Sequence, residues 1–125
     1  MNTMPAIPPA ILKKLYVKNS LRAEGDGFVL SLQNSIAPGV IQGFKGLTLD
    51  GKAVPLERVS IHQPDGTVVP AGAISEGNPV LFPLGAIVTL RVGGVPLSPG
   101  NHQVGIRVVV KDVGPLEIPV ADKVE

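Results

Sequence analysis

Hydrophobic residues alternate with other residues in the segment VGIRVVVK, residues 104–111, where Val104, Ile106, Val108 and Val110 take every second position. Successive side chains of a β-strand point to opposite faces, so this spacing predicts a strand with one buried face. Residues 88–92, which precede this segment in the chain, show the same alternation. It recurs on a smaller scale in residues 28–32, 47–49 and 59–61. The chain therefore contains several short strands, each with an apolar face.

Turn sequences separate these strands. Asp50-Gly51 and Pro64-Asp65-Gly66 each lie between two apolar runs, and Gly25-Asp26-Gly27 joins residues 15–23 to residues 28–32. Aspartate and glycine tolerate the positive φ angles that tight hairpin turns require. Short strands spaced about 8–12 residues apart, with turns between them, are typical of antiparallel sandwiches and barrels. We therefore predict an all-β fold for residues 15–125: a single antiparallel β-sandwich, immunoglobulin-like or jelly-roll-like, with no substantial helix.

The composition fits one small folded domain. The chain has 125 residues, of which 44% are hydrophobic and 17% charged, which excludes a disordered segment. Its 15 glycines and 13 prolines leave little room for long helices. Pro5, Pro8 and Pro9 lie in the first fourteen residues, which we predict to form an extended N-terminal arm. At most one helical turn is expected there, over residues 9–15.

The charges nearly cancel, with 11 Lys and Arg against 10 Asp and Glu. A nucleic-acid or membrane-surface partner is not expected, because such proteins carry clustered basic residues and Lys13-Lys14 is the only adjacent basic pair. Cysteine is absent, and no positive residue precedes the proline-broken apolar stretch at the N-terminus. A chain without disulfides or a good signal peptide is expected to be cytoplasmic.

The sequence contains few residues suited to catalysis. Its histidines are His62 and His102, and neither belongs to a G-x-S-x-G or H-E-x-x-H motif. The glycine-rich residues 39–46 do not end in the G-K-[ST] of a phosphate-binding loop. We therefore expect no catalytic, cofactor-binding or metal-binding residues in this chain. His102 follows the turn Ser98-Pro99-Gly100 and is expected to bond back to the main chain.

Apolar residues without regular periodicity are the remaining distinctive feature. Residues 36–41 and 80–84 are strongly apolar, and a domain this small is expected to bury such segments against another chain. His62 and Arg91 are expected to add polar contacts at the edge of that interface. The predicted partner-binding residues are therefore Ile36, Pro38, Val40, Ile41, His62, Leu81, Phe82, Pro83, Leu84 and Arg91.

Four motifs occur in an order that resembles a known family. They are NSLR at residues 19–22, GF at 27–28, LTLDGKAVP at 47–55 and LSPGNHQV at 97–104. Over residues 15–122 this order resembles the small (β) subunit of bacterial C-glycoside deglycosidases. The resemblance implies a β-sandwich bound to a larger TIM-barrel α subunit that resembles sugar isomerases. That large subunit would carry a divalent metal, often manganese, and the acid and base residues that cleave the carbon–carbon bond of a 3-oxo-C-glycoside.

Two other functions stay open at this point. The same apolar segments could meet their copies across a two-fold axis, which would make the chain a self-associating structural or binding sandwich and a homo-oligomer. A stand-alone carbohydrate-binding module is less favoured, because sugar platforms use aromatic faces. The aromatic residues of the chain are Tyr16, Phe28, Phe44 and Phe82, and Phe28 is predicted to be in the core.

Overall fold

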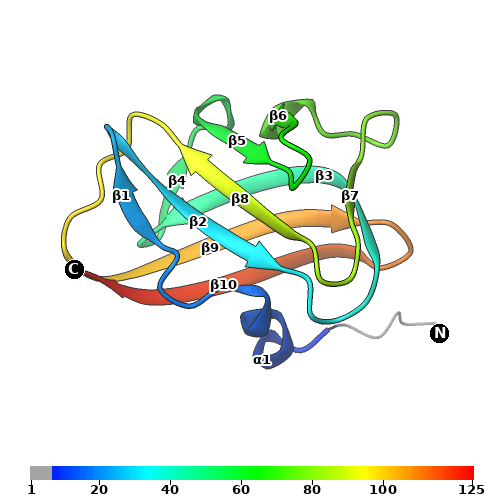
Figure 1. Ribbon diagram of the computed structural model, residues 1–125, viewed down its shortest axis with the longest axis horizontal. Coiled ribbons are helices and arrows are strands. Elements are labelled where there is room, and N and C mark those ends of the chain that lie inside the picture. Colours follow the sequence, from blue (N-terminus) through cyan, green and yellow to red (C-terminus); the bar gives the residue numbers. More distant parts are fainter. Residues whose placement is uncertain (1–6) are drawn as a thin grey trace.

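The computed structural model describes residues 7–125, which form two antiparallel sheets packed face to face (Figure 1). The first sheet has the order β1-β2-β8-β5-β6. It consists of β1 (Arg22–Glu24), β2 (Gly27–Gln33), β8 (Ile87–Val92), β5 (Val59–His62) and β6 (Val68–Pro70). The predicted all-β sandwich is confirmed.

The second sheet has the order β10-β9-β3-β4, and β7 pairs with the opposite end of β3. Its strands are β10 (Gly114–Val124), β9 (Gly100–Val110), β3 (Gly39–Leu49), β4 (Lys52–Val54) and β7 (Val80–Phe82). The helical segments are short: α1 (Pro9–Leu12), η1 (Lys13–Leu15), η2 (Leu56–Arg58) and η3 (Ala71–Ala73).

The alternating residues of the sequence form the core between the sheets. On β9, Val104, Ile106 and Val108 are at most 4% exposed. On β2, Phe28 and Leu30 are fully buried. The inward faces that the period-two pattern predicts on these strands are therefore confirmed, and they pack into one hydrophobic cluster.

Val29 departs from the alternation, because it is also buried, at 1% exposure, although it points away from the core. Its register partners are Arg22 on β1 and Arg91 on β8. Both arginines form ion pairs with Glu24. The paired side chains therefore lie on either side of Val29, and their aliphatic stems shield it from water.

The hairpin turn between β3 and β4 is the one that Asp50-Gly51 predicts. Asp50 has a φ of 52° and Gly51 a φ of 84°, so both residues adopt the left-handed backbone conformation. A two-residue turn of this type matches the right-handed twist of the strands that it joins. The Pro64-Asp65-Gly66 hairpin is also formed, between β5 and β6, with His62 opposite Val68.

The N-terminal segment is helical over residues 9–15, where at most one helical turn was predicted. Residues 9–14 of the predicted extended arm are therefore not extended, and residues 1–6 of that arm lie outside the described part. Leu12 and Leu15 are 3% and 6% exposed, so this segment is held by the core. It lies beside β10, an edge strand that contains Pro115 and Pro119. Proline is tolerated on an edge and prevents further strands from pairing there.

The apolar loop at residues 70–83 folds back onto the core. Ala71 and Val80 are fully buried, and Ile74 is 7% exposed. The segment ends in β7, whose outward-pointing residue Leu81 is 61% exposed. Leu81 therefore remains available at the surface, whereas the apolar residues Ala71, Ile74 and Val80 of the same segment are used by the core.

Candidate functional site

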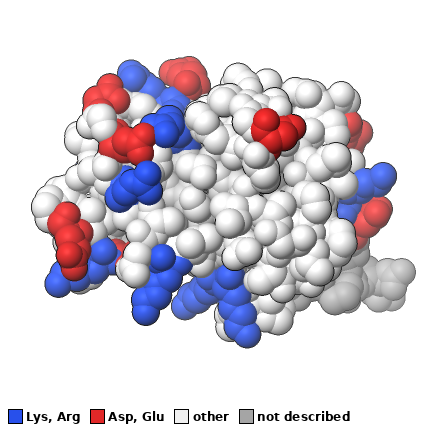
Figure 2. All heavy atoms as spheres, in the orientation of Figure 1, with Lys and Arg blue, Asp and Glu red and all other residues white. Residues whose placement is uncertain are grey.

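An exposed apolar surface lies where the β2–β3 loop, β7 and the β7–β8 turn meet, and we call it the apolar rim. Leu81, Leu84, Ile87 and Ile36 are 61%, 59%, 46% and 37% exposed. Figure 2 shows few charged side chains over β7 and the start of β8, whereas charges gather at the opposite end, near β1. We define the rim by six residues that wrap around this end of the sandwich: Leu81 and Val40 face outward from the second sheet, Ile87 faces outward from the first, and Ile36, Pro38 and Leu84 lie in the loops between them.

The side chain of Asn34 fixes the loop beneath the rim. Its Nδ2 donates hydrogen bonds to the main-chain oxygens of Ala37 and Phe82, each at 2.7 Å. Its Oδ1 accepts from the main-chain N–H groups of Ile36 at 3.1 Å and Ala37 at 3.3 Å. Asn34 is only 2% exposed, so these bonds are shielded from water. The β2–β3 loop is thereby tied to β7.

The main chain of Asn34 adds a second tie. Its N–H donates to Ala86 O at 2.9 Å, and its carbonyl accepts from Gly85 N–H at 2.7 Å. The two loops that carry Ile36 and Leu84 therefore form one hydrogen-bonded unit. Sequence reasoning missed Asn34, although an asparagine at a strand end is a recognised sign of a local side-chain turn.

The structure divides the predicted partner-binding residues into two groups. Ile36, Pro38, Leu81, Pro83 and Leu84 are exposed, and Val40 is half-buried opposite Leu81 on the paired strand. Ile41 and Phe82, by contrast, are 9% and 7% exposed and belong to the core cluster. Because strand alternation turns these two side chains inward, they support the rim from below and are removed from the set of exposed contacts. Ile87 was not predicted.

His62 and Arg91 lie apart from the rim, on the outer face of the first sheet. His62 is opposite Thr89, and Arg91 is opposite Ser60, in neighbouring rows. The His62 Nε2 lies 3.2 Å from Ser60 Oγ. Arg91 is paired with Glu24, whose pKa is lowered chiefly by the hydrogen bond from that guanidinium. Both predicted polar contacts are therefore engaged within the first sheet.

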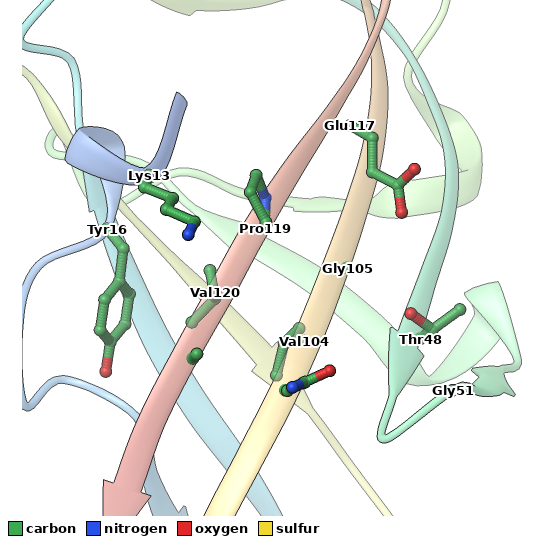
Figure 3. Close-up of a pocket in the computed structure, with 11 residues that line it drawn as sticks. Lys13, Tyr16, Thr48, Gly51, Val104, Gly105, Glu117, Pro119 and Val120 are labelled. Atoms are coloured by element: carbon green, nitrogen blue, oxygen red, sulfur yellow. The ribbon is translucent and has the colours of Figure 1, made fainter. Parts of the chain in front are cut away.

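A groove with a volume of about 560 Å³ crosses the outer face of the second sheet (Figure 3). Gly105 of β9 and Pro119 of β10 form part of its floor, and Thr48 comes from β3. Lys13 and Tyr16 border the groove beyond β10, and Gly51 borders it beside β4. Glu117, Gln103 and Ala121 also line it.

One wall of the groove is held by Tyr16. Its hydroxyl donates to Asp122 Oδ2 at 2.6 Å and accepts from Leu21 N–H at 2.8 Å. Burial raises the pKa of the Tyr16 hydroxyl, and the hydrogen bond to Asp122 adds to this. The same bond lowers the pKa of the Asp122 carboxyl. The segment after η1 is therefore attached to β10 at Asp122.

The β3–β4 turn on the other side of the groove is held by His102, whose own side chain does not line the groove. Its Nδ1 lies 2.6 Å from Asp50 Oδ2, and its Nε2 lies 2.7 Å from Ser98 O. Both facing atoms are acceptors, so the imidazolium, which donates from both nitrogens, is the form that matches. The bond to Asp50 is the main cause that raises the His102 pKa. The predicted bond of His102 to the main chain is confirmed, whereas its Asp50 partner was missed.

Asp50 is further fixed by the neighbouring strand. Its Oδ1 accepts from Gln103 N–H at 2.9 Å, and this bond is the main cause that lowers the Asp50 pKa. His102 lies directly opposite Asp122 in the β9–β10 ladder. The contacts that hold the two walls of the groove therefore meet at one pair of facing residues.

The described residues contain no group of three or more His, Asp and Glu side chains placed to hold a metal ion. None of the helices in residues 7–125 has the length and apolar character that a membrane crossing requires.

A comparison with solved structures finds a family 123 glycoside hydrolase from Clostridium perfringens, which is described in terms of glycolipid glycan hydrolysis. The two chains are 11% identical with a TM-score of 0.31, over 78% of this chain and 20% of that one. This chain thus spans about a fifth of the length of that hydrolase. A comparison with curated proteins gives no match.

A family match covers residues 11–125, and the family is described as hydroxymethylglutaryl-CoA reductase, N-terminal domain. Neither this family nor the hydrolase is named as a C-glycoside deglycosidase, so that resemblance remains a prediction. Because the match includes both sheets of the sandwich, the chain belongs to the family of hydroxymethylglutaryl-CoA reductase N-terminal domains.

Proposed function

We propose that this chain is a non-catalytic accessory subunit, which binds a larger catalytic subunit through the apolar rim. The observation that carries the proposal is the rim itself, where Leu81, Leu84 and Ile87 are between 46% and 61% exposed on adjoining segments. Large apolar side chains gathered at the surface of a small domain are characteristic of protein interfaces. The membership in a family described as an N-terminal domain also agrees with a unit that works beside other parts of an enzyme.

The rim is suited to binding because its loops are held in place before a partner arrives. The buried amide of Asn34 bonds to both the β2–β3 loop and β7. A preorganised surface loses less conformational entropy on association than a mobile one. Leu84 is the preferred anchor, since it is 59% exposed at the tip of a turn and can enter a pocket of the partner.

For the partner, we propose the metal-dependent TIM-barrel α subunit of a C-glycoside deglycosidase, with the divalent metal and the acid and base residues on that subunit. The support is the order of the sequence motifs that resemble the β subunit of this enzyme. Two of them meet in the fold, because Asp50 of LTLDGKAVP contacts His102 of LSPGNHQV. Both motifs therefore contribute to one contact of this sandwich, and the activity itself needs a direct test.

The test is to mix the full chain with the α subunit of a C-glycoside deglycosidase. Complex formation is followed by size-exclusion chromatography with light scattering, and cleavage is followed with a 3-oxo-C-glycoside. We expect a stable complex whose cleavage rate exceeds that of the α subunit alone. Leu84→Asp is expected to weaken the complex by about 2 kcal/mol or more, since it places a charge at an interface anchor.

Val68→Asp is the matched control, because Val68 is 51% exposed but lies on β6, outside the rim. It should leave the complex intact. Equal loss in both variants, or no complex with the unaltered chain, would contradict the proposal. A homodimer of the chain alone that Leu84→Asp dissociates would instead identify the rim as a self-association surface.

The family match favours a second candidate, in which the chain accompanies the catalytic part of a hydroxymethylglutaryl-CoA reductase. The same mixing experiment separates the two candidates when it is repeated with that catalytic part and its substrate. Stimulated reduction of hydroxymethylglutaryl-CoA, without stimulated cleavage of the C-glycoside, would replace the first partner by the second.

A further inference from the structure

We propose that the groove on the outer face of the second sheet binds a neutral polyhydroxylated molecule of the sugar or polyol class. None of the residues that line this groove belongs to the apolar rim. The proposal therefore concerns a second surface of the chain, and it does not depend on which large subunit the rim binds.

The floor of the groove is open at Gly105. A Cβ atom added there would lie 2.8 Å from Thr48 Oγ1 and 3.1 Å from Glu117 Oε2. A hydroxyl from β3 and a carboxylate from β10 thus approach the same uncovered glycine of β9, and Figure 3 shows both side chains beside that strand. The space that a side chain would fill is therefore bordered by two groups that can bind hydroxyls.

The polar side chains of the groove are not used by the fold. Within residues 7–125, no hydrogen bond or ion pair occupies the side-chain polar atoms of Lys13, Thr48, Gln103 or Glu117. Together they offer an ammonium, a hydroxyl, an amide and a carboxylate. One positive and one negative group leave the site without net charge, which favours a neutral ligand with several donors and acceptors.

The walls that carry these groups are held in place. Tyr16, three residues after Lys13 in the chain, is bonded to Asp122 at 2.6 Å. Asp50, which precedes Gly51, is bonded to His102 at 2.6 Å. Such supporting contacts fix the width of a binding site and reduce the entropy lost on binding.

Hydrogen bonds rather than aromatic stacking would provide most of the affinity, because Tyr16 is the one aromatic side chain among the residues that line the groove. The hydrocarbon surfaces of Pro119 and Ala121 on β10 are placed to contact the C–H groups of a sugar ring. A small ligand held mainly by solvent-accessible hydrogen bonds binds weakly, with a Kd of about 1–10 mM.

The test is a titration of the ¹⁵N-labelled full chain, followed by amide NMR shifts, with D-glucose and myo-inositol as separate probes. We expect saturable shifts that are largest at residues 48, 103–105 and 117–121. Gly105→Ala should weaken binding at least about tenfold, because the new methyl group occupies the floor and displaces Thr48 and Glu117. Glu117→Gln removes the carboxylate while keeping the shape of the side chain, and it should also weaken binding.

Gly43→Ala is the matched control on the same sheet, because its nearest contact would be an ordinary 3.5 Å from Lys45. It should bind like the unaltered chain. Shifts that do not saturate, or an unchanged response in a folded Gly105→Ala variant, would overturn the proposal. Stronger binding of glucuronate or glucosamine than of glucose would also overturn it, since the site would then select charge. A failed rim experiment leaves these outcomes unaffected, because the titration uses this chain alone.

Discussion

Asp50 and His102 are fifty-two positions apart in the sequence, and their side chains meet at 2.6 Å. The contact joins the β3–β4 turn to the start of β9, and the second ring nitrogen of His102 joins both to the loop at Ser98. The two residues are too far apart in the sequence to meet through a local turn. The β3–β4 turn and the loop before β9 are therefore joined by a contact that only the folded topology creates.

This link predicts a pH dependence of stability. The pKa of His102 is raised in the folded chain by the bond to Asp50. The protonated ring therefore stabilises the fold fully below the unfolded pKa of about 6.5, and the stabilisation is lost as the pH rises through the higher folded pKa. The lowered Asp50 pKa acts at the acid end, where stability is lost as the pH falls through it.

The measurement compares the free energy of unfolding of the unaltered chain and of His102→Gln between pH 6 and pH 9. The difference between them should be largest at pH 6 and should shrink towards pH 9. His62→Gln is the control, because His62 faces Ser60 and has no carboxylate partner among the described contacts. A difference for His102→Gln that is constant across this range would show that folding does not change the His102 pKa, and would contradict the prediction.

A second prediction concerns Asn34. Asn34→Ala removes the donor to Phe82 O and leaves that main-chain oxygen buried without its partner. An unsatisfied buried polar group costs about 1–3 kcal/mol, and loss of the bonds to Ile36 and Ala37 adds to this. We expect urea unfolding to show a loss of about 3 kcal/mol. Ser35→Ala, at the next and exposed position, should change stability by less than about 0.5 kcal/mol.

A third prediction separates the core from the rim on adjacent residues of β7. Phe82 is 7% exposed and Leu81 is 61% exposed. Phe82→Ala should therefore destabilise the chain by about 3–5 kcal/mol through the cavity that it leaves. Leu81→Ala should cost less than about 0.5 kcal/mol, because it removes a side chain that is already in water. Equal losses in thermal unfolding would mean that Leu81 is packed rather than available to a partner.

The strands could be predicted from the sequence because their signal is local. The alternation in residues 88–92 and 104–110 predicts burial of one strand face, and the pair Asp50-Gly51 predicts the positive φ angles of its turn. The alternation does not account for the burial of Val29, because the side chains that cover it are arginines on two neighbouring strands. Strand pairing of this kind is set by the fold and leaves no periodic trace in the sequence.

The candidate sites were predicted only in part for the same reason. Leu81 and Leu84 were found because an apolar segment is visible in the sequence, whereas Phe82 between them was assigned to the surface with them. The groove was not predicted, because Thr48, Gly105 and Glu117 come from three strands that are adjacent only in the sheet. In the sequence each of them is an ordinary strand residue, and only the pairing register of the sheet places the three side by side.

The fourth prediction tests the packing between β2 and the end of β8. A Cβ atom on Gly27 would lie 1.8 Å from Val92 O and 2.8 Å from Val92 C, both of which are main-chain atoms that cannot rotate away. Gly27→Ala must therefore separate the two strands where they pair, and we expect the variant to lose cooperative thermal unfolding or to be insoluble. Gly93→Ala is the control, because a Cβ there has no heavy atom within 4 Å. It should fold and unfold like the unaltered chain, within about 1 kcal/mol. A stable Gly27→Ala variant with the same amide NMR pattern would mean that β2 and β8 are further apart than this close approach requires.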